Sequence, residues 1–355
     1  MSIRYTPGED SWSPESPALH ELDVTLEQGG RVVDRVRERF GIRSIEARGR
    51  QSVLNGRPLK VRGVNRYDEY GRFGPNPPRE LVEEELRLMK RTGVNLIRTH
   101  YPQAPWFLEL CDRMGILFLE ELPINWWGLE SVGKDGAEQR ESILDQALPM
   151  LETMIRRDRN HPCVIIWSMC NESKTDSEIG IKVIKRLIRR TKELDRTRLV
   201  TFVTDSGSVR EHRAYANADL VAANMYPGSL GEPLADHVSQ LDERARKPAE
   251  AILRTHLAGF PDKPLLITEF GAMGFHGVRG PVASTEDFQA AYITALWETI
   301  ASNPNVSGGV LWSWADYYHR RNFQALGAFG PFGVVTVDRQ PKAALQALGV
   351  AFGKY

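Results

Sequence analysis

Two glutamates stand at the ends of two apolar runs, and as a pair they could act as an acid and a nucleophile. Residues 164–172 are apolar and partly β-branched until the run ends on Asn171 and Glu172, and residues 264–271 carry Glu269 before a glycine. Such runs are typical of buried parallel strands. Cleaving a glycosidic bond with retention needs a carboxylic acid and a carboxylate about 5 to 5.5 Å apart. One strand-end glutamate often only caps a loop or pairs with an arginine, but two of them favour a catalytic pair.

The rhythm of the chain after residue 55 predicts the fold that would bring these glutamates together. Apolar runs alternate with amphipathic segments, which is typical of an α/β protein. The predicted strands cover residues 59–64, 94–98, 116–119, 164–172, 199–203, 220–226, 265–269 and 309–314. Eight strand–helix units are the number that closes a (β/α)8 TIM barrel. The C-terminal strand ends of such a barrel form one mouth, across which the fourth and seventh strands would present Glu172 and Glu269.

The sequence also predicts where two of the later helices break and end. Residues 237–257 are expected to form a helix broken near Pro248. The closing helix is expected over residues 342–348, with Gly349 as its stop.

The first 50 residues do not follow the barrel rhythm. Residues 19–26 alternate apolar and polar, Gly29 and Gly30 mark a turn, and residues 31–37 alternate more loosely. We therefore expect two or three antiparallel strands in a segment 1–50, ahead of a barrel spanning 51–355. Because so small a sheet is only marginally stable, it must pack on the barrel, on a domain outside this sequence, or on another copy as a homo-oligomer.

Composition excludes several classes of partner. The 46 basic and 46 acidic residues balance, and no basic run is interleaved with aromatics, so we expect no nucleic acid partner. The first residues lack the apolar core of a signal peptide and no apolar run is long enough to span a bilayer, so we expect a cytoplasmic protein without a membrane partner.

The odd cysteine count, with Cys111, Cys163 and Cys170 in or beside apolar segments, indicates reduced core residues. The eight Trp and ten Tyr suit sugar stacking and a large core equally.

A set of ordered motifs resembles glycoside hydrolase family 2, the family of β-galactosidases, β-glucuronidases and β-mannosidases. The motifs lie at residues 40–43, 54–58, 63–66, 98–102, 160–162, 167–172 and 268–271. The resemblance implies that Glu172 is the general acid/base and Glu269 the nucleophile, with a carbohydrate as the partner and no cofactor. It also implies that Asn171 holds the sugar 2-hydroxyl, a contact that strengthens in the transition state. By the same likeness, segment 1–50 would be the end of an immunoglobulin-like sandwich.

The resemblance assigns three further residues to the sugar pocket. Tyr226 would hydrogen-bond the nucleophile with Asn224 beside it, and Trp312 would form the floor of the sugar subsite, although either aromatic could be plain core. The likeness also implies a cis peptide bond at Trp312-Ser313.

Three further candidates lie near the ends of the first two barrel strands. Arg98 would lie under Glu269 and keep it ionised, or else form a structural ion pair with Glu121. Asn65 and His100 would line the pocket, although His100 could instead be a structural residue.

A metal is not expected. Asp68 and Glu69 could suggest one, since some galactosidases of the family use a metal, but two adjacent acids on a loop are usually only solvated.

The loop after the eighth strand bears on the sugar. Glucuronidases of the family place an Asn-x-Lys triplet there to hold the sugar carboxylate, whereas residues 329–333 contain neither residue. Arg320 and Arg321 are the nearby substitutes in the sequence. We therefore expect a retaining exo-β-glycosidase acting on a neutral hexoside, with β-galactoside first. Two alternatives are a β-glucuronidase with a non-standard carboxylate site and a catalytically idle carbohydrate-binding or assembly protein.

Overall fold

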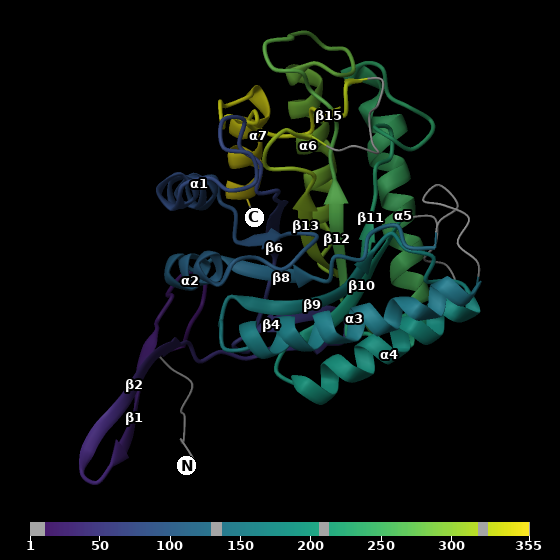
Figure 1. The fold of residues 1–355 in the computed structure, drawn as a ribbon. Coiled ribbons are helices and arrows are strands. Elements are labelled where there is room, and N and C mark those ends of the chain that lie inside the picture. The colour runs from purple at the N-terminus through teal and green to yellow at the C-terminus, as the bar shows by residue number, and fades with distance from the viewer. Residues whose placement is uncertain (1–10, 129–136, 206–212, 319–325, 355) are drawn as a thin grey trace.

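Eight parallel strands close into a barrel, as the sequence predicts (Figure 1). The computed structural model describes residues 11–128, 137–205, 213–318 and 326–354. The barrel strands are β6 (Val61–Asn65), β7 (Leu96–Arg98), β8 (Leu117–Glu121), β9 (Val164–Asn171), β10 (Leu199–Asp205), β11 (Val221–Asn224), β12 (Leu265–Phe270) and β13 (Val306–Leu311). Neighbours in sequence are neighbours in space, and β13 pairs with β6 to complete the ring.

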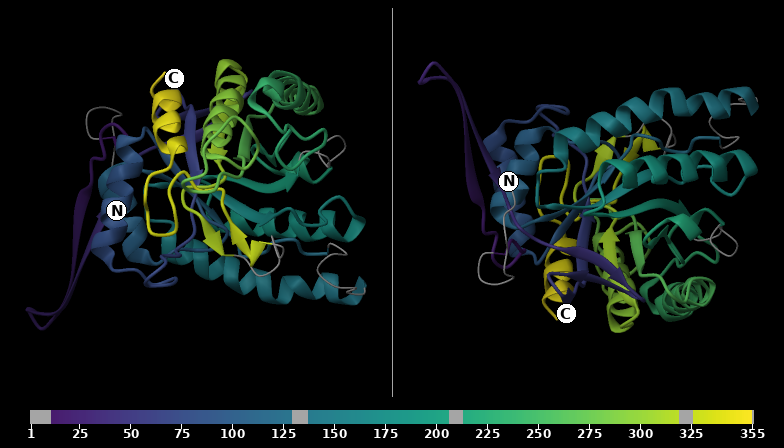
Figure 2. Two further views of the ribbon diagram at one scale, coloured as in Figure 1. Left: turned by 90° about the horizontal axis from the view of Figure 1, so that it is seen from above. Right: turned by 90° about the horizontal axis from the view of Figure 1, so that it is seen from below.

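Helices surround the strands, as the two end views show (Figure 2). They are α1 (Arg79–Arg91), α2 (Pro105–Met114), α3 (Ala137–Asp158), α4 (Glu178–Leu194), α5 (Lys247–Gly259), α6 (Glu286–Ser302) and α7 (Ala343–Gly353). Apolar stripes dictate which face of each helix is buried; α1, for example, buries Val82, Leu86 and Met89.

Three details of the helices differ from the prediction. Within the described residues the strand β10 is followed by a 3-10 turn, η3 (Arg213–Asn217), rather than by an α-helix. The expected break near Pro248 precedes that residue: the short turns η4 (Val238–Gln240) and η5 (Asp242–Arg246) come first, and Pro248 stands in the first turn of α5, where a missing N–H costs nothing. Gly349 does not end α7, which continues past it to Gly353.

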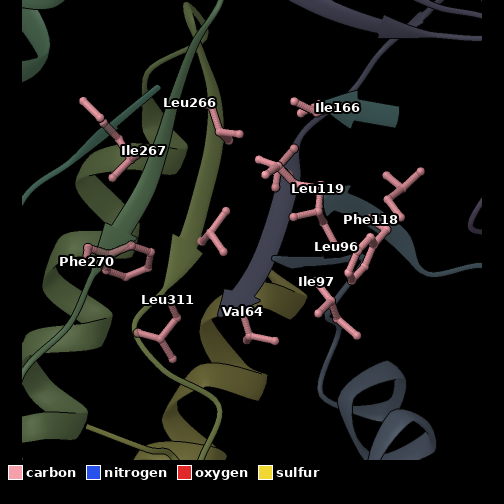
Figure 3. Close-up of a cluster of buried hydrophobic side chains, with 14 of the residues drawn as sticks. Val64, Leu96, Ile97, Phe118, Leu119, Ile166, Leu266, Ile267, Phe270 and Leu311 are labelled. Carbon is pink, nitrogen blue, oxygen red and sulfur yellow. The ribbon is translucent and has the colours of Figure 1, made fainter. Parts of the chain in front are cut away.

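The barrel strands pack through apolar side chains (Figure 3). Val64, Leu96, Leu119, Ile166 and Leu311 belong to one buried cluster that joins several strands and their covering helices. Burying this much apolar surface is the main favourable term in folding, so the rim can carry polar groups that are costly to bury.

The strand β8 presents two adjacent acids to opposite sides. Successive side chains of a strand alternate, so Glu121 meets Arg98 in the barrel while Glu120 meets Arg157 and Asp158 on the helix side. Both glutamates are fully buried.

The N-terminal segment forms a projecting hairpin and a small sheet. The hairpin strands β1 (His20–Gln28) and β2 (Arg31–Phe40) extend away from the barrel (Figure 1) and do not fold onto its wall. The sheet contains β3 (Ile45–Arg48), β4 (Gln51–Leu54) and β5 (Arg57–Pro58), and so spans residue 50. Beside the sheet, Trp12 is buried and donates its indole N–H to Asp112 O at 2.8 Å.

The hairpin has two unlike faces. One face carries ion pairs between Asp23 and Arg37 and between Glu21 and Arg39. The other face places Val24 opposite Val36, and both side chains are about half exposed, at 51% and 46%.

Candidate active site

The two catalytic candidates lie at the same end of the barrel. Glu269 is the penultimate residue of β12, and Glu172 directly follows β9. Because all barrel strands are parallel, their C-terminal ends open on one mouth. Glu172 has a φ of 42°, in the left-handed region that non-glycine residues rarely adopt, and such backbone strain persists where the surroundings enforce it.

Glu269 is held by a cation and a phenol. Its Oε1 accepts from Arg98 Nη1 at 2.9 Å, and its Oε2 accepts from the Tyr226 hydroxyl at 2.6 Å. Only 6% of the Glu269 side chain is exposed. These donors fix both oxygens of a carboxylate that would attack an anomeric carbon.

Arg98 contacts both of its alternative partners at once. It pairs with Glu269, and its Nη2 contacts Glu121 Oε2 at 3.0 Å and Oε1 at 3.1 Å. Burial acts to lower the pKa of Arg98, but attraction to Glu121 and Glu269 outweighs it and raises that pKa. Arg98 therefore contacts Glu269 and also forms the ion pair with Glu121, so the two interpretations hold together.

The buried charges are compensated unequally. Burial raises the pKa of Glu269, and Arg98 opposes this rise without cancelling it. For Glu121 burial also acts upward, yet Arg98, His100 and Ser168 together lower its pKa. Arg98 thus satisfies Glu121 more completely, and its expected effect of keeping Glu269 ionised is only partial.

Glu172 is held through each of its oxygens. Asn224 Nδ2 donates to Glu172 Oε1 at 2.8 Å, and the indole Nε1 of Trp126 donates to Glu172 Oε2 at 2.9 Å. Asn224 Oδ1 in turn accepts from Thr268 Oγ1 at 2.8 Å. Thr268 directly precedes Glu269, so a short chain of hydrogen bonds connects the two catalytic strands.

Asn171 is fixed on both sides of its amide. Its Oδ1 accepts from Arg98 Nη2 at 2.8 Å and from Asn224 Nδ2 at 3.1 Å, while its Nδ2 donates to Asn125 Oδ1 at 2.9 Å. An amide nitrogen carries two N–H groups. Among the described residues only Asn125 accepts from it, which leaves one N–H available for a ligand.

His100 and Asn65 occupy different depths. His100 Nδ1 lies 2.8 Å from Glu121 Oε1, and its Nε2 is 3.8 Å from Glu269 Oε1. Asn65 accepts from Arg98 Nη1 at 3.1 Å and donates to the backbone of Thr268 at 2.9 Å. Because its amide is committed to these buried partners, Asn65 supports Arg98 and the backbone next to Glu269, which corrects our expectation that it lines the pocket.

Trp312 directly follows β13 and packs beside His100. Its ring centroid lies 5.3 Å from that of His100, and its indole donates to the Tyr317 hydroxyl at 2.9 Å. The Trp312-Ser313 bond is cis, as predicted. Trp312 belongs to a separate buried cluster with Tyr317 and Phe332, against which Tyr226 packs.

The described residues offer no group of three or more His, Cys, Asp or Glu side chains that could hold a metal. Asp68 pairs with Arg66, and Glu69 accepts from the backbone N–H of Tyr318 at 2.7 Å. The three cysteines are buried and form no disulfide. In the same described ranges, no helix is both long and apolar enough to span a membrane.

Arg320 and Arg321, the sequence candidates for contacting a sugar carboxylate, lie outside the described residues.

The fold and its rim of paired carboxylates are those of a glycoside hydrolase barrel, and the chain belongs to glycosyl hydrolases family 2. The family model for the TIM barrel domain matches residues 45–354, and a second model of the same family matches residues 6–43.

Several similar proteins are named as enzymes that act on uronic acid glycosides. The chain is 32% identical to the β-glucuronidase of Sus scrofa over 95% of its own length and 52% of that protein. The structure of the Ruminococcus gnavus β-glucuronidase is similar with a TM-score of 0.89 at 26% identity, covering 97% of this chain and 58% of that one. The galacturonate-bound β-galacturonidase of Eisenbergiella tayi is similar with a TM-score of 0.85 at 27% identity, covering 97% and 60%. The chain therefore spans about half the length of the curated relatives it matches.

Sequence reasoning missed Trp126. It lies in the loop after β8, has a φ of 56°, and contacts Glu172, 46 positions away. The available signal was the Trp126-Trp127 pair just beyond a barrel strand, where functional loops lie.

Proposed function

We propose that this chain is the catalytic part of a retaining exo-β-glycosidase, with Glu269 as the nucleophile and Glu172 as the acid/base. The proposal rests on one observation: the two carboxylates accept hydrogen bonds from different kinds of donor. Glu269 is held by Arg98 and Tyr226, whereas amide and indole donors hold Glu172. Two carboxyl groups in different environments are what a division into nucleophile and acid requires.

In the first step the Glu269 carboxylate attacks the anomeric carbon while the bond to the leaving oxygen breaks. The proton of Glu172 moves to that oxygen, and a glycosyl ester forms on Glu269. In the second step Glu172 takes a proton from water, whose oxygen attacks the same carbon and frees Glu269. The remaining N–H of Asn171 is placed to donate to the sugar 2-hydroxyl during both steps.

The names of the similar proteins favour a β-linked uronic acid as the sugar of the substrate. The curated protein quoted above is a β-glucuronidase, and the similar structures include a galacturonate complex. A buried carboxylate needs a cation or several donors, because an unpaired buried charge costs several kcal/mol. In this chain the sequence candidates for that role are Arg320 and Arg321.

A neutral β-galactoside is the second candidate, and the loop after β13 supports it. Phe332 is fully buried, and its ring centroid lies 6.4 Å from that of Tyr226. A Cβ at Gly330 would lie 2.6 Å from Tyr317 Cζ, so no side chain fits there without a shift. Pro331 also lacks a backbone donor. Residues 330–332 thus present apolar groups where family glucuronidases present an amide and an ammonium.

A panel of nitrophenyl β-glycosides tests the proposal. Glucuronide, galacturonide, galactoside, glucoside and mannoside are compared by kcat/KM, with Glu269→Gln as the control for contaminating activity. Turnover that Glu269→Gln abolishes supports the enzyme, and its absence on every sugar would favour the idle binding protein. A uronoside preference that disappears in an Arg320→Ala, Arg321→Ala double variant supports the first sugar. Preference for galactoside, unchanged in that variant, supports the second.

Product stereochemistry tests the mechanism independently of the sugar. We expect proton NMR to show the β-anomer as the first-formed product. An α-anomer would show inversion and contradict a covalent intermediate on Glu269.

A further inference from the structure

The loop between β8 and α3 is fastened to the acid/base by successive hydrogen bonds. Trp126 N donates to Asn171 O at 3.0 Å, Trp127 N donates to Ser173 Oγ at 3.1 Å, and Lys174 N donates to Trp127 O at 2.8 Å. These contacts place the Trp126 side chain beside Glu172.

Both partners of the Trp126–Glu172 hydrogen bond have left-handed backbones. Trp126 has a φ of 56° and Glu172 a φ of 42°. A non-glycine residue in this region is strained and persists only where its surroundings hold it. Two such residues joined by one side-chain hydrogen bond of 2.9 Å indicate a conformation that the local contacts enforce.

We propose that Trp126 is a positioning residue for the acid/base, and that its ring forms part of the wall met by the leaving group. This inference rests on the proposed function. Asn224 holds one oxygen of Glu172 and Trp126 holds the other, so the carboxyl plane is fixed only when both donors are present. Asn224 also donates to Asn171, and Trp126 donates its indole N–H to Glu172.

The chemistry of the leaving group determines where Trp126 matters. The Glu172 proton passes to the leaving oxygen as the glycosidic bond breaks, so Glu172 lies on the leaving-group side of the sugar. Trp126 is only partly buried and lies against Glu172 on that side. A half-buried indole offers an aromatic leaving group a stacking surface.

Two substitutions separate the donor from the ring. Trp126→Phe keeps an aromatic ring and removes the N–H, so we expect kcat/KM to fall about 10- to 100-fold on phenyl or alkyl glycosides, which need the proton. On 2,4-dinitrophenyl glycosides, which leave without a proton, we expect less than about a threefold change. Trp126→Ala should show the same dependence on the leaving group and, in addition, a raised KM for aryl substrates.

The matched control is Trp127→Phe. Trp127 is the next residue of the same loop and packs against the main hydrophobic cluster, while its polar contacts to Ser173 and Lys174 use the backbone. We expect its dependence on the leaving group to match that of the unsubstituted chain. If Trp126→Phe also matches it while the chain remains active, Trp126 does not position Glu172 and the inference is wrong. Absence of turnover in the unsubstituted chain would instead overturn the proposed function.

A second measurement needs neither substrate nor a folded Trp126 variant. The indole N–H resonance of Trp126 should shift in Glu172→Ala, because its acceptor is removed, while the Trp127 indole resonance should not. A Trp126 resonance that stays unchanged in Glu172→Ala would overturn the contact and the inference with it.

Discussion

Tyr226 donates its hydroxyl proton to Glu269 Oε2 at 2.6 Å, and it does so from the strand end next to that of the nucleophile. Burial raises the pKa of Tyr226, with Glu269 adding to the rise, so the phenol stays protonated and remains a donor. The carboxylate is therefore oriented by a group that cannot titrate in the working range.

Removing this donor should slow turnover without unfolding the chain. A hydrogen bond to a charged group contributes about 1.5 to 3 kcal/mol, so Tyr226→Phe should lower kcat by roughly 10- to 100-fold. Steady-state kinetics on the best nitrophenyl substrate measures it, with thermal melting as the control for folding. An unchanged kcat would show that Arg98 orients Glu269 without help.

The two catalytic glutamates should fail in different ways. Glu269→Gln should abolish turnover, since no covalent ester can form. Glu172→Ala should retain activity on dinitrophenyl substrates and be rescued by azide, which attacks the ester without needing a base. Mass spectrometry of the released sugar would then identify the glycosyl azide. Rescue of Glu269→Gln with the same product anomer would reverse the assignment.

Gly271 lies where β12 passes Trp312. A Cβ at this position would be 2.0 Å from the Trp312 backbone oxygen, a contact that only a backbone shift can relieve. We expect Gly271→Ala to destabilise the chain by about 1 to 3 kcal/mol and to lower kcat, because Glu269 and Trp312 move.

The control is Gly259→Ala at the end of α5, where no atom lies within 4 Å of the added carbon. Its stability should be equal to or greater than that of the unsubstituted chain, since alanine favours a helix over glycine. Chemical denaturation compares the two, and equal stabilities would contradict the steric argument.

Glu120 should make stability depend on pH. Burial, followed by repulsion from Asp158, raises the pKa of Glu120 well above its usual 4.5. Between that value and the folded-state pKa the native state holds a proton that the unfolded chain has lost, so stability falls as pH rises. Glu120→Gln keeps an N–H donor toward Asp158 but cannot ionise. It should match the unsubstituted chain near pH 4.5 and exceed its free energy of unfolding at pH 8 by on the order of 1 kcal/mol.

Denaturant titrations at both pH values check this difference, and the exposed α1 residue Glu84 provides the control substitution, Glu84→Gln. A Glu120→Gln variant that loses stability at pH 8 would show that the ionised carboxylate is the favoured form.

The apolar face of the hairpin should promote self-association. Val24 and Val36 face each other across β1 and β2 and are about half exposed. Exposed apolar strands pair readily with other chains. Val24→Thr with Val36→Thr keeps β-branched residues and should lower the mass seen in sedimentation equilibrium, while Thr25→Ser on the charged face should not. An equal mass in all three chains would exclude this face as the contact.

Periodicity was sufficient to predict the barrel, because each buried parallel strand is a short apolar run that the chain itself displays. The same rule predicted Glu172 and Glu269, which end two such runs. Asn65 was misplaced because the sequence shows that it ends a strand but not how deep it lies, and only its contacts with Arg98 and Thr268 reveal this. Trp126 was missed because its role depends on a loop backbone at positive φ, which no periodic pattern encodes. The helix between β11 and β12 and the turn after β10 differ in the same way, since propensity does not determine how a connection closes.

Because Glu120 and Glu121 alternate along β8, the register of this strand determines which of the two meets Arg98. Hydrophobic strands tolerate a slip of one residue when both of their faces are apolar, since either set of side chains can fill the core. In β8 a slip of one residue would turn Glu120 toward Arg98 and send Glu121, whose pKa is lowered, into the helix layer. Insertion or deletion of one codon in this strand should therefore abolish the site, because it shifts the strand by one residue and exchanges the sides on which the two glutamates lie.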